Sequence, residues 1–213
     1  MRAFALFLAA GVSLSACTMN NEGDMGPVPR VAPPAAMTGD PSSPMTAAGY
    51  VPMAASSDQL EIQSSQLALQ ASTNQAVRSF ANMMIAHHQS TSAALASAAA
   101  SAGLPPPPMA LLPMHQQMLD QLRSAGTGQA FDNAYKAMQI QSHQAALQLH
   151  QGYASGGDVP ALRQAAASAV PIVQQHLTAA QNLNVMGAMM SPGMPMNGQP
   201  APATAPVRSG ERG

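Results

Sequence analysis

Apolar residues recur three and four positions apart along four long stretches of the chain, and this period constrains the fold more than any other sequence feature. The clearest series comprises Val77, Ala81, Met84, His88, Thr91, Leu95 and Ala98. Side chains at this spacing fall on one face of an α-helix, whereas a half-buried strand would alternate apolar and polar residues. The chain is also rich in Ala, Gln, Leu and Met and lacks Trp, which favours helices over a sheet. We therefore predict an all-α protein.

Turn and capping residues divide the apolar series into helices. Between the second and third long helices, the proline run at residues 105–108 and a short helix over residues 109–124 form a long crossover. Two helical hairpins joined by such a crossover make a four-helix bundle of ferritin-like plan. The expected helices open at Ser57–Asp58, near Asn74, after a capping Thr127, and at Asp158 with Pro160 in the first turn.

Proline-rich segments flank the predicted bundle and set the domain organisation. Residues 17–55 and residues 185–213 are rich in Pro, Gly and Ser or Met and have no apolar period, so we expect a disordered tether and a disordered tail. The bundle itself is expected at residues 56–184, which is the size of one ordinary domain. Residues 1–16 are predicted to be a separate export signal.

Cys17, the only cysteine, ends the run Leu-Ser-Ala-Cys directly after an apolar stretch that follows Arg2. This layout resembles a bacterial lipoprotein signal, which implies that Cys17 becomes the lipidated first residue of the mature chain. Acyl chains on that residue would hold the protein on a membrane. Because Thr18 follows in place of an aspartate that would favour inner-membrane retention, we expect the cell envelope, at the outer membrane facing the periplasm.

Several function classes are excluded by composition and motifs. Lys and Arg number only 8 and form no basic run, so we expect no nucleic-acid partner. The sequence has no phosphate-binding loop or dinucleotide fingerprint, so we expect no nucleotide, and it has no Gly-x-Ser-x-Gly elbow for a nucleophilic serine. No catalytic residue is predicted.

Four blocks of the predicted bundle, residues 60–72, 77–90, 131–164 and 170–183, together resemble the bacterial family called domain of unknown function 4142. The resemblance implies an exported, ferritin-like protein without an established activity. Where that family commonly has Asp-His, this chain has His87-His88 and Ser142-His143. Locally, residues 83–89 (MMIAHHQ) are more similar to the group called domain of unknown function 305, whose members are often described beside copper genes.

Histidines are the candidate metal ligands. His88 and His176 lie on apolar seams of different helices, where an alkyl side chain would pack better, and His143 lies near the edge of its own seam. His87 and Glu61 complete the candidate set, for copper, zinc or iron. Helical rise places His143 roughly 18 Å and His176 roughly 27 Å from the turn between their helices, a mismatch that a kink or tilt would have to reduce.

Each candidate also has a structural interpretation. A buried histidine is more often a hydrogen-bonded core residue than a ligand. Glu61, three residues after Asp58, would complete a capping box at the start of the first helix. The methionines suit core gaps, although those of the tail, which include Met189, Met190 and Met194, are also suitable Cu(I) ligands. The sequence thus favours a non-catalytic envelope scaffold, with a metal-binding protein as the alternative and a metalloenzyme third.

Overall fold

A computed structural model describes residues 34–186 of the chain, and within them it contains five α-helices and no strand. The all-α prediction is confirmed. The helices are α1 (Ala47–Ala71), α2 (Gln75–Ser101), α3 (Pro113–Ser124), α4 (Gln129–Gly156) and α5 (Pro160–Asn182).

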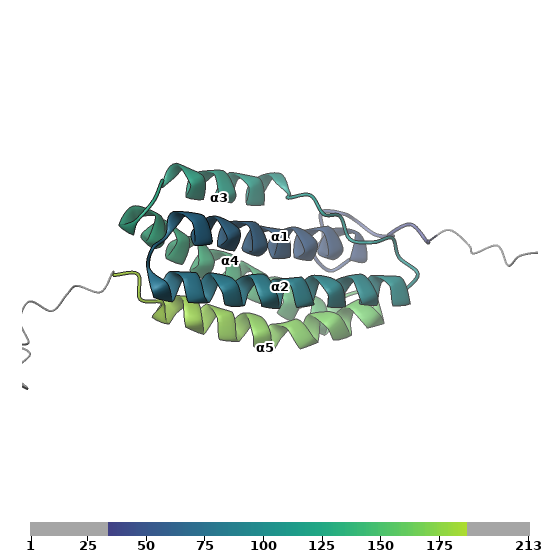
Figure 1. The fold of residues 1–213 in the computed structure, drawn as a ribbon. Helices are drawn as coiled ribbons and strands as arrows, with labels where there is room; N and C mark the ends of the chain where they lie inside the picture. The colour runs from purple at the N-terminus through teal and green to yellow at the C-terminus, as the bar shows by residue number, and fades with distance from the viewer. Residues whose placement is uncertain (1–33, 187–213) are drawn as a thin grey trace, which may run out of the picture. The chain divides into compact units, whose positions relative to one another are not determined.

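The four long helices form a bundle in which each helix packs between two others (Figure 1). Apart from the hairpins α1–α2 and α4–α5, α1 packs on α4 and α2 packs on α5. The backbone N–H of Ala47 donates to the carboxylate of Asp158 over 2.8 Å, which ties the start of α1 to the α4–α5 turn. At the other end, Asn74 before α2 donates to the carbonyl of Asn184 after α5. All four neighbouring pairs are therefore antiparallel, and the chain must travel the length of the bundle between α2 and α4.

The crossover contains α3, which lies against α1 and α4 on the outside of the bundle (Figure 1). Pro113 occupies the first turn of α3, where its missing N–H has no helical partner to lose. Leu119 and Leu122 bury the inner face of α3. Four long helices with one long crossover agree with the predicted bundle plan.

The interior divides into two apolar clusters with a polar layer between them. One cluster lies around Phe80, Met84 and Tyr135, and the other around Tyr50 and Tyr153. Between these clusters, seven buried polar side chains project from the four long helices: Asp58, Glu61, His88, Gln139, Ser142, His143 and His176. An apolar layer at this level would cost nothing in desolvation, so the polar layer needs a chemical explanation.

The predicted start of the first helix at Ser57 is wrong, and so is the assignment of residues 47–55 to the tether: α1 begins at Ala47 and contains Pro52. A proline inside a helix costs about 3 kcal/mol because it removes a hydrogen bond and crowds the preceding turn. Tyr50 and Val51 are almost wholly inaccessible to solvent. Burying a large apolar side chain contributes about 1.5–3 kcal/mol, so the two together offset the cost of the proline.

The start of α4 also differs from the prediction. Gly128 precedes the helix with φ of 70°, and no side chain caps the first turn, so Thr127 is not the cap. A positive φ at this position suits glycine, which lacks the Cβ that would clash there. The last helix starts at Pro160 and not at the predicted Asp158, and the prediction that Pro160 lies in its first turn is confirmed.

The predicted signal, the lipidation site at Cys17, the first part of the tether and the tail at residues 187–213 lie outside the described residues. Among residues 34–186, no helix combines the length and hydrophobicity that crossing a membrane requires.

Candidate metal centre

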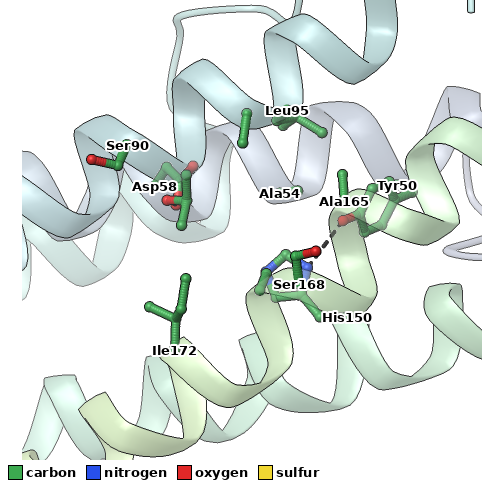
Figure 2. Close-up of a pocket in the computed structure, with 12 residues that line it drawn as sticks. Tyr50, Ala54, Asp58, Ser90, Leu95, His150, Ala165, Ser168 and Ile172 are labelled. Atoms are coloured by element: carbon green, nitrogen blue, oxygen red, sulfur yellow. Dashed lines mark hydrogen bonds between the residues drawn. The ribbon is translucent and has the colours of Figure 1, made fainter.

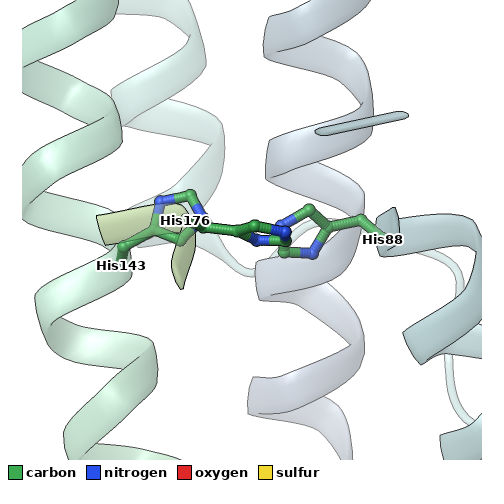
Figure 3. Close-up of side chains that lie close together, drawn as sticks. All are labelled: His88, His143 and His176. Atoms are coloured by element: carbon green, nitrogen blue, oxygen red, sulfur yellow. The ribbon is translucent and has the colours of Figure 1, made fainter. Parts of the chain in front are cut away.

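Three histidines from three different helices meet in the polar layer: His88 of α2, His143 of α4 and His176 of α5 (Figure 3). The exposed fractions of the three residues are 4%, 1% and 0%. One ring nitrogen from each lies within 4.8 Å of the other two, and the ring centroids are 5.2–5.6 Å apart. Three imidazoles at this spacing could bind one ion.

The direction of the side chains explains how His143 and His176 reach the same level. Both α4 and α5 carry Cα–Cβ bonds that tilt toward the N-terminus of their own helix. Because the helices are antiparallel, the ring of His143 leans away from the turn that joins them and the ring of His176 leans toward it. These directions reduce the mismatch expected from helical rise, and the two ring centroids lie 5.3 Å apart.

Each of the three histidines has one ring nitrogen in a hydrogen bond with an outer partner. His88 Nδ1 lies 2.8 Å from Asp58 Oδ1, and His143 Nδ1 lies 2.7 Å from the carbonyl oxygen of Gln139. Both partners are acceptors, so in the neutral rings Nδ1 carries the proton and Nε2 carries a lone pair. His176 Nε2 lies 2.7 Å from His87 Nδ1, and donation from His176 leaves a lone pair on its Nδ1.

Within residues 34–186, the second ring nitrogens of these histidines have no hydrogen-bond partner. They are His88 Nε2, His143 Nε2 and His176 Nδ1, and all three are buried. Buried polar atoms are nearly always partnered, because an unpartnered one costs about 1–3 kcal/mol. In each of these three rings, the other nitrogen is held by a hydrogen bond to a partner outside the cluster. Metal-ligating histidines have this arrangement, with one nitrogen for the metal and the other hydrogen-bonded to a supporting group.

Two buried carboxylates border the histidine cluster. Asp58 contacts His88, and Glu61 Oε1 lies 3.7 Å from His143 Nδ1. Glu61 is held by Ser142 Oγ, which donates to Oε1, and by Gln139 Nε2, which donates to Oε2 over 2.6 Å. The polar layer thus places two acidic side chains beside the three histidines.

No lysine or arginine pairs with either carboxylate in the part of the chain that the structure describes. The four basic side chains of that part, none of which contacts Asp58 or Glu61, are Arg78, Arg123, Lys136 and Arg163. Three of them donate to backbone carbonyl oxygens, and Arg123 pairs with an exposed aspartate. Compensation of the buried negative charge must therefore come from the histidines or from a bound cation.

The histidines differ in their affinity for a proton. Burial lowers the pKa of His143, against the opposing charge of Glu61. Burial and the neighbouring His88, His143 and His87 lower the pKa of His176 far below its ordinary range. Burial also disfavours protonation of His88, but the hydrogen bond with Asp58 and the charges of Glu61 and Asp58 outweigh it and raise the pKa of His88. In the metal-free protein a proton therefore resides on His88 in preference to the other two.

A pocket of about 120 Å³ lies beside the cluster, between α1, α2, α4 and α5 (Figure 2). Its polar lining includes Asp58, Ser90 and His150, and Nδ1 of His150 lies 3.0 Å from the hydroxyl oxygen of Tyr50, to which it is hydrogen-bonded. Alanines and Ile172 supply much of the remaining wall. Because Asp58 is shared between this pocket and His88, a molecule in the pocket would contact the group that orients His88.

The structure brings together the three predicted residues His88, His143 and His176 and places the other two around them. His87 is half-buried and contacts the cluster through His176. Glu61 turns inward, and the capping-box interpretation is wrong because Asp58 lies in the middle of α1. The edge position expected for His143 is also wrong, because that ring is buried.

Sequence reasoning missed Asp58, Gln139 and Ser142 as parts of the site. The available signal was the spacing: Asp58 and Glu61 lie three residues apart, as do Gln139 and Ser142, so each pair shares a helix face. Two polar pairs on the inner faces of packed helices indicate a polar layer, provided that the helix start is placed correctly.

A helical bundle with a buried, three-histidine cluster in a polar layer defines the class of this protein. Within that class, the chain belongs to the family described as Domain of unknown function (DUF4142), which matches residues 32–183. No curated protein sequence and no solved structure matches the chain.

Proposed function

We propose that this protein binds one transition-metal ion through His88, His143 and His176. Two observations carry the proposal: three buried imidazole nitrogens have no hydrogen-bond partner among residues 34–186, and the three rings approach so closely that one nitrogen of each lies within 4.8 Å of the other two. A metal ion would satisfy all three lone pairs at once. Neutral imidazoles suit Zn²⁺, Cu²⁺, Fe²⁺ and Ni²⁺ and disfavour Mg²⁺ and Ca²⁺, which prefer oxygen ligands.

The charge around the cluster supports a dication. Asp58 and Glu61 are 7% and 1% exposed, and they lie against His88 and His143 without a lysine or arginine partner among residues 34–186. Burying an uncompensated charge is strongly unfavourable, whereas an ion of charge +2 would balance both carboxylates. Asp58 and His88 would form the carboxylate–histidine–metal arrangement that orients ligands in metal sites.

The polar layer also favours this proposal over a pure scaffold. A scaffold would gain stability from an apolar layer, since replacing buried ionic groups by packed hydrophobic residues is often neutral or stabilising. The bundle instead buries seven polar side chains in one layer. Retention of that layer is explained if it binds an ion.

The proposed localisation of the protein is the cell envelope. In this proposal, Cys17 is lipidated and residues 18–46 link the anchor to the bundle at the outer membrane, facing the periplasm. Cys17→Ser should therefore move the protein out of the membrane fraction or leave it as an unprocessed precursor. Fully processed, membrane-associated protein in this variant would contradict the lipid anchor without affecting the metal proposal.

Titration of the purified full-length chain with Zn²⁺ and Cu²⁺ tests the metal site. We expect one tightly bound ion per chain and an increase in Tm near pH 7.5 that is much smaller near pH 5, because protons compete for the imidazoles. An ion at about 100 times its Kd adds about 2.7 kcal/mol of stability.

Single substitutions His88→Ala, His143→Ala and His176→Leu should each abolish the tight binding. His150→Gln is the matched control, because His150 lies on α4 outside the cluster and should leave the stoichiometry at one. Helical circular dichroism verifies that each variant is folded. Unchanged binding in the three cluster variants, or no binding of Zn²⁺, Cu²⁺, Fe²⁺ or Ni²⁺ by the wild type, would overturn the proposal.

A further inference from the structure

A second group of metal-binding side chains surrounds a pocket of about 120 Å³ between α1, α3 and α4. Met53 lines it from α1, and Met114, His115 and Met118 line it from α3. Ser57, Gln141 and Ser142 and three apolar residues of α4 form the remainder of the wall. This pocket shares none of the three histidines of the proposed metal centre.

Packing accounts for only part of the methionines of this pocket, since Met118 is partly buried against the apolar cluster around Phe80, Met84 and Tyr135. Methionine in a core fills irregular gaps, yet here three of them surround a space that stays open. Met114 is 51% exposed, so its thioether contributes little burial. Met114 and Met118 lie one helical turn apart on the same face of α3, which directs both side chains toward the pocket.

One ring nitrogen of His115 is held by a hydrogen bond. It is 7% exposed, and its Nδ1 lies 2.6 Å from Ser56 Oγ, which in turn accepts a hydrogen bond from the backbone N–H of Leu112. If Nδ1 donates to Ser56, Nε2 carries the lone pair. Burial lowers the pKa of His115, which keeps the ring neutral.

The lining of this pocket is also uncharged, since no aspartate or glutamate is part of it. The histidine cluster, in contrast, has two carboxylates beside it. Neutral, soft donors match a soft ion of single charge, whereas a dication would gain no charge compensation here. Thioether and imidazole donors together suit Cu(I).

We infer that Met53, Met114, His115 and Met118 form a binding site for a soft monovalent cation, Cu(I), with Ag(I) as its redox-inert equivalent. The site takes an ion of different charge and softness from the ion proposed for the histidine cluster. It does not depend on that cluster, and either site could exist without the other.

Ag(I) titration of the full-length chain labelled with ¹³C at the methionine methyl groups tests the inference. We expect the methyl signals of Met53, Met114 and Met118 to shift together and to reach an end point at one ion per chain. Shifts confined to methionines outside the pocket, such as those of the C-terminal tail, would overturn it.

Affinity measurements with Cu(I) and a competing chelator give the second readout. The double variant Met114→Leu/Met118→Leu conserves volume and should remain folded, but it should lose the Cu(I) affinity of the wild type. Met109→Leu is the matched control, because Met109 is 74% exposed and lies outside this pocket.

His88→Ala separates the two proposals. This variant should keep the Cu(I) site and lose only the divalent site, so loss of Cu(I) binding in His88→Ala would assign the ion to the histidine cluster and overturn the second site. Retention of full Cu(I) affinity in the double methionine variant would also overturn it. If the wild type fails to bind Zn²⁺ but binds Cu(I) as expected, the result contradicts the histidine site and not the methionine site.

Discussion

The Nδ1 atom of His88 lies 2.8 Å from Oδ1 of Asp58, which is 30 residues earlier in the chain and on the neighbouring helix. Asp58 also accepts hydrogen bonds from Thr91 over 2.9 Å and from Ser92 over 3.0 Å. Both carboxylate oxygens are therefore held, and the carboxylate cannot rotate without breaking bonds to α2. This anchoring fixes the tautomer of His88 and aims Nε2 away from Asp58.

Asp58→Asn should weaken divalent-metal affinity about 10- to 100-fold, as loss of a ligand-orienting carboxylate does in other metal sites. The amide retains the shape of the side chain and removes its charge. Competition with a chromophoric chelator measures the effect. Asp120→Asn, which removes an exposed carboxylate on α3, is the control and should leave the affinity unchanged.

Glu61→Gln should maintain or raise the stability of the metal-free protein and should lower the affinity for the metal. The variant removes a buried charge that has no lysine or arginine partner in the described bundle, so the metal-free protein should be as stable as the wild type or more stable. The ion loses a compensating charge, so its affinity should fall. Thermal unfolding with and without Zn²⁺ measures both effects, and a fall in the stability of the metal-free protein would contradict the charge argument.

Removal of residues 1–55 should destabilise the bundle by several kcal/mol, whereas removal of residues 1–33 should not. The longer deletion takes away Tyr50 and Val51, each worth about 1.5–3 kcal/mol when buried. It also removes the stacking of Tyr50 on Tyr153, whose ring centroids lie 3.9 Å apart. Urea unfolding of the two truncated chains measures the difference, and equal midpoints would show that α1 begins later than Ala47.

The stability of the metal-free protein should fall as the pH decreases from about 6.5 to 4. Burial lowers the pKa of His150 from 6.5 in its reference state to about 4 in the folded protein. In this window the unfolded chain takes up a proton that the folded chain does not, so acid favours unfolding by up to about 1.4 kcal/mol per pH unit for this group. Below pH 4 its contribution is constant.

His150→Gln should flatten this part of the pH profile while retaining a hydrogen-bonding side chain next to Tyr50. Chemical denaturation at several pH values provides the test. A profile with the same slope in His150→Gln and wild type would assign the acid sensitivity to other residues.

Helical periodicity was sufficient to predict the long helices, because packing in a bundle imposes the same period on the sequence. The N-terminal boundary of α1 was not predictable in this way. Pro52 is unfavourable locally, and the burial of Tyr50 against α4 that compensates for it is a tertiary effect.

The candidate site was predictable only in part. His88 and His176 stand out because each interrupts an apolar seam. His143 does not, because α4 packs against α1, α3 and α5, and these three neighbours bury a wider face than one stripe. The role of Asp58 follows only once α1 is known to extend past it, since the same residue at a helix start would be a cap. Metal ligation by any of these residues stays a prediction.

The histidines of the cluster come from both helical hairpins, with His88 on the first and His143 and His176 on the second. An ion bound to all three would be a cross-link between the hairpins in the centre of the bundle. It could leave only when the hairpins separate at that level, so its residence time would report the frequency of a local opening of the fold. Exchange with free metal would then be slow even where the equilibrium affinity is moderate.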